Sequence, residues 1–211
     1  MIHEIDEALR GLLAPAVTGD VAFEAPTREW AARRNAPTLN AYLYDIREDL
    51  ARRERGALAE RDAQGVVTRR RLPPRWFRLS YLVTAWTTRP EDEHRLLSGV
   101  LALLLPHETL PEEAVPGSVR PISTALPLSV GVPPAESRSL ADIWSALGGE
   151  LKPSLDVVIT TPFPVAPSYA AAPPVTEAEI VVQGGEGARG EPRPRVVRRI
   201  SIPGPREGSG S

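Results

Sequence analysis

The sequence of 211 residues contains no cysteine, three histidines and a single lysine, Lys152. Without cysteine the chain has no disulfide bond, no thiolate zinc site and no cysteine nucleophile. A fold that needs no disulfide suits a reducing compartment, so we expect a cytoplasmic protein. Arginine supplies nearly all of the basic charge, and 25 basic residues against 27 acidic ones leave a net charge of -2. No global field therefore favours nucleic acid or an anionic membrane.

Long hydrophobic runs are also missing. The longest, at residues 100–105, is far too short to cross a bilayer, and the N-terminus lacks the basic and apolar regions of a signal peptide. Hydrophobic residues make up 42% of the chain and charged residues 25%, which is ordinary for a soluble globular protein. We therefore expect no membrane partner, and one sizeable core with or without an extension.

Residues 89–111 (RPEDEHRLLSGVLALLLPHETLP) combine acids, two histidines and an apolar run, which raises the question of an active site. A helix explains them more simply, because Thr88 and Glu91 have the spacing of a capping box and acids suit the first turn. His94 and His107 would lie at opposite ends of that helix, ~20 Å apart, so we expect no metal site. Nucleophile-elbow, P-loop and dinucleotide motifs are absent from the whole sequence. We therefore expect no enzyme, no catalytic residue, no cofactor and no small-molecule substrate.

Hydrophobic periodicity predicts an alternation of helices and strands. We expect a helix from the N-terminus to about Ala14, a loop at 26–37, a strand at 39–46, a strand from 66 to 88 interrupted by Pro73-Pro74, a helix capped by Ser139, a strand at 155–160, and β-like runs at 179–183 and 196–202. The stretch RWFRLSYLVTAW is apolar on both sides, which is typical of a central strand. The pattern indicates an α+β fold.

Arginines cluster between residues 47 and 78, as RRER and RRR with two aromatic residues close by. Basic residues beside aromatics are the composition of a module that binds single-stranded nucleic acid, which is the alternative function for this chain. Acids are interspersed among these arginines, however. Strands at 39–50 and 66–72 paired as a long hairpin would set acids opposite arginines. We therefore favour a charged assembly surface over a nucleic-acid partner.

Several stretches in this order resemble one known family. They are MIHEIDEALRGLL, LNAYLYDIRED, RWFRLSYLVTAWTTRPEDEHRLLSGVLALLLPHETLP, SLADIWSALGG followed by KPSLDVVITTPF, and PPVTEAEIVV. Together they are similar to the Pvc16-type N-terminal domain family, over roughly residues 1–183. The tryptophan helix followed by a Pro-Ser-Leu strand (Trp144, then 153–155) is the most specific part of the resemblance.

The resemblance implies a structural role. Members of that family are cap proteins, or tail terminators, of phage-tail-like contractile injection systems. A hexameric ring of such subunits would seat on the last layer of the inner tube, engage the sheath, end polymerisation and stabilise the extended sheath. The implied fold is α+β, like phage tail terminators: a mixed β-sheet with packed helices. We expect a cap domain at 1–183 and a partly flexible extension rich in Pro, Gly and Arg at 184–211.

Two groups of residues are the candidate assembly interface. A ring needs head-to-tail contacts that close by rotation, and an extended strand can add to the edge of a neighbour's sheet. The candidates are Arg52, Arg53, Arg55, Arg69, Arg70 and Arg71 from the arginine-rich segment, and Glu179, Ile180, Val181, Val182, Val197 and Ile200 from the C-terminal strands.

Overall fold

A computed structural model describes residues 1–133, 139–165, 168–172, 177–182 and 196–201 of the chain. The helices are α1 (Ile2–Leu13), α2 (Arg28–Ala32), α3 (Pro90–Leu104) and α4 (Leu140–Ala146), with short 3-10 turns η1 (Ala14–Ala16), η2 (Leu50–Arg52) and η3 (Glu112–Ala114). The strands are β1 (Asp20–Ala22), β2 (Thr38–Glu48), β3 (Leu58–Arg61), β4 (Val67–Arg71), β5 (Arg75–Trp86), β6 (Leu128–Val130), β7 (Ser154–Phe163), β8 (Ser168–Ala170), β9 (Glu177–Val182) and β10 (Val196–Ser201).

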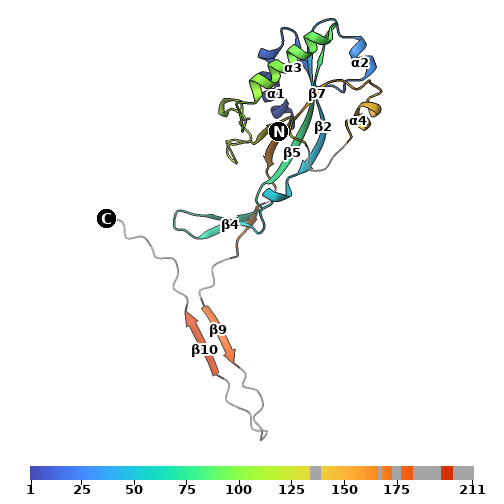
Figure 1. Cartoon of the computed structure of the whole chain (residues 1–211). Coiled ribbons are helices and arrows are strands. Elements are labelled where there is room, and N and C mark those ends of the chain that lie inside the picture. Colours follow the sequence, from blue (N-terminus) through green and yellow to red (C-terminus); the bar gives the residue numbers. More distant parts are fainter. Residues whose placement is uncertain (134–138, 166–167, 173–176, 183–195, 202–211) are drawn as a thin grey trace, which may run out of the picture. The chain divides into compact units, whose positions relative to one another are not determined.

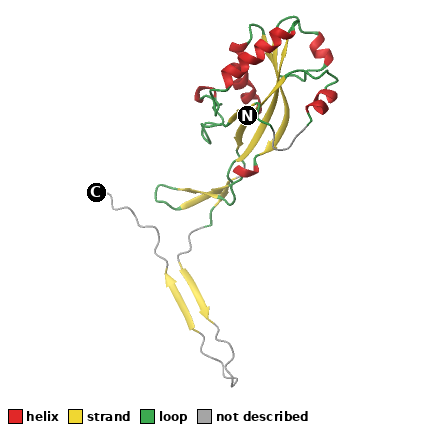
Figure 2. Cartoon of the chain, in the orientation of Figure 1, coloured by secondary structure: helices red, strands yellow, loops and turns green. Residues whose placement is uncertain are grey.

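The chain divides into two units, and each is described by itself. The first unit comprises Met1–Glu54 and Pro74–Pro164, and the second comprises Arg55–Pro73 and Val165–Ser211. Figure 2 shows helices and strands together in the first unit, whereas every described element of the second is a strand.

The first unit is built on a five-stranded sheet in the order β1-β2-β5-β7-β6. β1 pairs with β2 in parallel, and the other neighbours are antiparallel. The predicted mixed sheet with packed helices is therefore confirmed. β5 lies at its centre, as its two apolar sides predicted, because a strand buried on both faces needs neighbours and helices on each side.

Helices α1 and α3 cover one face of this sheet, and α2 and α4 lie on the other (Figure 1). On the first face, α1 buries residues at helical spacing against alternate residues of the central strands. These residues are Ile5, Leu9 and Leu13 of α1, Leu79, Tyr81, Val83 and Ala85 of β5, and Val157 and Ile159 of β7. The Tyr81 hydroxyl donates a 2.7 Å hydrogen bond to the Asp6 carboxylate, so its polar end is satisfied inside the core.

Three tryptophans form the layer on the opposite face. The ring centroids of Trp30 in α2 and Trp86 in β5 are 5.4 Å apart, and those of Trp86 and Trp144 in α4 are 6.4 Å apart. The helix predicted after Ser139 is present, and Gly148, with φ of 67°, ends it. Ser139 occupies the N-cap position but makes no side-chain capping bond, and Trp144 is the helix residue that is buried.

Three local expectations are wrong. The loop predicted at 26–37 contains α2, whose N-cap Thr27 accepts a hydrogen bond from the Trp30 amide. The predicted capping box of Thr88 and Glu91 does not form, because Pro90 takes the first helical position and so places Arg89 at the N-cap. The hairpin of 39–50 with 66–72 does not form either, since β2 pairs with β5. The alternating apolar residues of β2 need an apolar neighbour, and β5 provides one where the charged β4 does not.

The second unit contains two small sheets. One has three antiparallel strands in the order β3-β4-β8, and the other is the antiparallel pair β9 and β10. The segment predicted to run from 66 to 88 is therefore two strands in different sheets, separated at the two prolines. The predicted C-terminal strands are present. The flexible stretch predicted at 184–195 and the tail predicted at 204–211 lie outside the described residues, and the domain boundary at 183 stays a prediction.

Candidate functional site

The predicted interface residues lie in three places. Arg52 and Arg53 belong to the first unit, and Arg55 with the triplet 69–71 belongs to the second. The remaining candidates lie in β9 and β10, which pair with each other from Glu177 opposite Ser201 to Val182 opposite Val196. The arginines are thus not one continuous surface, and each group has its own chemistry.

Arg52 and Arg53 are held by acids at the end of β2. Arg53 makes two hydrogen bonds to the carboxylate of Glu48, at 2.8 and 2.5 Å, and Arg75 reaches the same carboxylate at 3.1 Å. The hydrogen bond from Arg53 lowers the pKa of Glu48. Arg52 lies 3.5 Å from the Asp49 carboxylate and 5.1 Å from the centroid of the Trp76 ring. Both guanidinium groups therefore fix the chain where it leaves the first sheet, and their charge is compensated locally.

The sheet of β3, β4 and β8 is the most arginine-rich part of the described chain, and none of its strand residues is buried. Arg69 donates to the Ser168 hydroxyl at 3.1 and 2.6 Å, and Arg71 lies 3.4 Å from the Glu60 carboxylate. Arg70, between them, has no hydrogen-bond or ion-pair partner among the described residues. The triplet therefore contains two engaged arginines and one free guanidinium group.

Ion pairs within the arginine-rich segment at 47–78 bear on the alternative function, nucleic-acid binding. Arg47, Arg53 and Arg75 all lie within ion-pair distance of acids, at 2.8, 2.5 and 3.1 Å. Phosphates would have to displace these carboxylates, which removes much of the electrostatic advantage of the segment. The nucleic-acid alternative gains no support from this arrangement.

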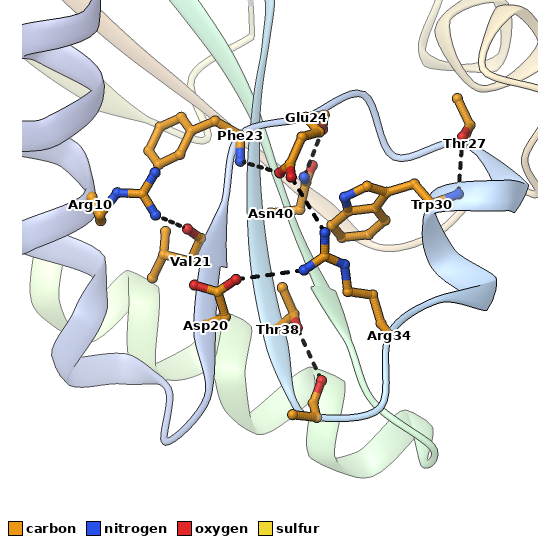
Figure 3. Close-up of polar contacts among 11 residues, drawn as sticks. Arg10, Asp20, Val21, Phe23, Glu24, Thr27, Trp30, Arg34, Thr38 and Asn40 are labelled. Carbon is orange, nitrogen blue, oxygen red and sulfur yellow. Dashed lines mark hydrogen bonds and ion pairs between the residues drawn. The ribbon is translucent and has the colours of Figure 1, made fainter.

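The edge strand β1 is capped by side chains (Figure 3). Arg10 of α1 donates to the carbonyl oxygen of Val21 and stacks over the Phe23 ring at 4.8 Å. The Glu24 carboxylate accepts a 3.1 Å hydrogen bond from the Phe23 amide. A shallow groove of about 390 Å³ runs along this edge, lined by Arg10 and residues 20–24. Backbone groups that would otherwise pair with another strand are thus bonded to side chains at these two positions.

Arg34 connects β1 to α2, as Figure 3 shows. Its guanidinium lies 3.6 Å from the carboxylate of Asp20, 3.5 Å from that of Glu24 and 4.3 Å from the centroid of the Trp30 ring. Asn40 of β2 donates to the Glu24 carbonyl at 2.8 Å. Backbone hydrogen bonds lower the pKa of Glu24, and the charge of Arg34 adds to that effect. The sequence reasoning missed this network because it depends on α2, which was expected to be loop.

A second groove, of about 530 Å³, lies between α1 and η3. Its lining includes the apolar residues Ala8, Leu12 and Val115 and the exposed acids Glu7 and Glu113. Neither of these carboxylates has a partner among the described residues. The groove therefore combines an apolar surface with two uncompensated negative charges.

Comparison with known protein families gives one decisive match. A family model, the Pvc16 N-terminal domain, aligns with residues 3–177. The chain belongs to this family. The family assignment made from the sequence is therefore confirmed. A search of curated protein sequences finds no match.

Solved structures similar to this Pvc16 N-terminal domain chain include two terminators. One is the sheath/tube terminator of an extracellular contractile injection system, PVC, in the extended state. It shares 25% identity with a TM-score of 0.64, over 88% of this chain and 64% of that chain. The other is the tube-terminating cap of the anti-feeding prophage, which resembles the chain in fold, with 23% identity, a TM-score of 0.57, and coverage of 84% and 60%. The chain thus spans about three fifths of the length of both terminators, and the predicted terminator-like fold is confirmed.

The Pvc16 N-terminal domain match ends at Glu177, the first residue of β9. It includes all but the first two residues of the first unit and the β3-β4-β8 sheet, so both grooves and the arginine triplet lie within the family region. Nearly all of β9 and the whole of β10 lie beyond it. In the described part of the chain, no cluster of three metal-ligating side chains occurs, and no helix has the length and apolarity needed to span a membrane.

Proposed function

We propose that the chain is a structural cap, or tail terminator, of a contractile injection system. It seats as a hexameric ring on the end of the inner tube, contacts the end of the sheath, stops polymerisation and stabilises the extended sheath. The observation that carries the proposal is the family match over residues 3–177, together with the similarity to a sheath/tube terminator at 25% identity.

The physical character of the chain supports the proposed role. A ring of identical subunits needs two different, complementary surfaces on each subunit. The described chain has surfaces of opposite charge, a free guanidinium group on the β3-β4-β8 sheet and free carboxylates beside the groove of α1 and η3. The three-stranded sheet buries none of its own strand residues, so covering one of its faces in an assembly would stabilise it further. The proposal assigns binding, and no catalysis, to these groups.

The test is electron microscopy of particles from cells that lack the gene, with the lengths of tube and sheath measured. We expect tubes of irregular length and sheaths that contract prematurely, and we expect the intact gene supplied in trans to restore a single length. A tagged chain should label one end of each particle. Particles of normal length and extended state without the gene would refute the proposed function.

A further inference from the structure

The face of the β3-β4-β8 sheet that carries Arg70 differs from its opposite face. The register places Ala59, Arg70 and Tyr169 side by side across the three strands. Because successive residues of a strand alternate between faces, Arg69 and Arg71 belong to the other side. There they are occupied, by Ser168 and Glu60 respectively. The first face therefore presents a guanidinium group without a partner beside a phenol ring.

Exposure makes this face unusual for a free subunit. The Tyr169 side chain is 56% exposed although it lies next to the central strand of its sheet. Tyrosine and arginine are the residue types that most often carry the binding energy of protein interfaces, and they do so where aromatic area and a bidentate donor meet a complementary pocket. The opposite face has no aromatic residue, and its two arginines, Arg69 and Arg71, are already bonded within the sheet. We take the Arg70 face, defined by Ala59, Arg70 and Tyr169, as the surface that needs a partner.

The groove between α1 and η3 has complementary chemistry. An aromatic ring packs against apolar side chains, which Ala8, Leu12 and Val115 supply in the lining of the groove. A guanidinium group requires a carboxylate, and Glu7 and Glu113 are exposed and have no partner among the described residues. Each copy of the chain carries both surfaces, so one contact of this kind repeats from copy to copy in a head-to-tail arrangement.

We propose that the Arg70 face of one copy binds in the groove between α1 and η3 of a second copy, with Arg70 paired to Glu7 or Glu113. This inference rests on the proposed function, since it describes how the subunits of the cap contact each other. Of the three arginines in the triplet, the inference assigns only Arg70 to the interface between copies. Arg69 and Arg71 instead bond to Ser168 and Glu60 within their own sheet.

The absence of cysteine from the sequence allows a direct test, because introduced thiols are the only thiols in this chain. Ala59→Cys places a thiol on the Arg70 face, and Gly117→Cys places one beside the groove, where an added side chain meets no atom within 4 Å. Purified particles carrying both substitutions are treated with a short thiol-specific cross-linker. We expect a ladder of linked subunits. Leu58→Cys with Gly117→Cys is the matched control, because residue 58 lies on the opposite face, and it should give no ladder.

Charge variants test the chemistry of the contact. Arg70→Gln should lower the yield of the ladder about tenfold, as expected for loss of an interface arginine, whereas Arg71→Gln should leave it unchanged. Arg70→Glu should abolish the ladder, and combining it with Glu7→Arg or Glu113→Arg should restore it. Restoration by neither combination would overturn the pairing.

The outcomes separate this inference from the proposed function. If the chain is present at particle ends but the Ala59 and Gly117 thiols give no ladder, the inference is wrong and the function stands. A shift in the mobility of single subunits without a ladder would place the contact within one copy, which also overturns it. If the chain is absent from particle ends, the proposed function fails and the inference fails with it.

Discussion

Replacing Lys152 with methionine should destabilise the first unit, because this lysine forms a half-buried ion pair. Its ammonium group bonds the carboxylate of Glu93 in the first turn of α3 and lies 4.4 Å from the centroid of the Trp86 ring. The two charged side chains are 22% and 12% exposed, respectively. Methionine keeps the length and flexibility of the side chain, so the substitution removes chiefly the charge.

The expected magnitude lies between two known limits. Exposed ion pairs contribute about 0–1 kcal/mol, and breaking a buried pair costs about 3–5 kcal/mol. Since Lys152 and Glu93 are mostly but not fully buried, we expect about 2 kcal/mol from the pair and about 0.5–1 kcal/mol from the ring contact. Lys152→Met should therefore lower the free energy of unfolding by about 2.5–3 kcal/mol.

A double-mutant cycle with Glu93→Gln isolates the pair. Urea unfolding followed by tryptophan fluorescence should give a coupling energy of about 1–2 kcal/mol. The matched control is Arg95→Met, which removes an exposed pair with Asp92 on the same helix and should cost no more than about 0.5 kcal/mol. Equal effects of the Lys152 and Arg95 substitutions, or a coupling energy near zero, would refute the reasoning.

Three further predictions concern single side chains. The Asp156 carboxylate accepts a 3.0 Å hydrogen bond from the Tyr44 hydroxyl, and burial raises its pKa. The native state therefore binds the proton more tightly, and the free energy of unfolding falls as pH rises from the ordinary carboxyl pKa to the raised one. Asp156→Asn keeps an oxygen that can accept from Tyr44, and its urea midpoint should exceed that of the wild type increasingly across that pH window. Gly19→Ala places a Cβ 1.9 Å from a backbone oxygen and should lower the Tm, whereas Gly11→Ala, in an exposed turn of α1, should raise stability by about 0.5–1 kcal/mol. Trp144→Ala should cost about 3–5 kcal/mol in the same urea assay, because the side chain is 2% exposed.

The strongly periodic elements could be predicted from the sequence. Ile5 and Leu9 repeat at helical spacing and are fully buried in α1, and the two apolar sides of β5 correctly indicate its central position. These elements follow local rules, since hydrophobic period alone decides which face is buried. The fold class follows from their alternation.

Strand partners and short elements could not be predicted in the same way. The pairing of β2 with β5 depends on packing between segments that are distant in the sequence. The arginines of β4, opposite the acids at the end of β2, instead suggested that β2 pairs with β4. Helix α2 has five residues, of which only Trp30 is buried, so it has no period to detect. The local indication of this helix in the sequence is Thr27, because threonine is favoured at the N-cap position.

The candidate site, too, could be predicted only in part from the sequence. The sequence indicates that the arginine triplet matters, but the three residues look equivalent until the strand and its neighbours are known. Only the register with β3 and β8 separates Arg70 from Arg69 and Arg71. The carboxylates of Glu7 and Glu113 are distant in the sequence and come together only because η3 packs beside α1.

The bonded edge of β1 has a consequence for the life of a free subunit. On the proposed function, copies accumulate in the cell before a finished tube end is available, and an open strand edge would let waiting copies join into aggregates. Arg10 and Glu24 occupy backbone groups along that edge. These bonds therefore disfavour pairing of unassembled copies along the β1 edge, so that free subunits are less prone to aggregate through it.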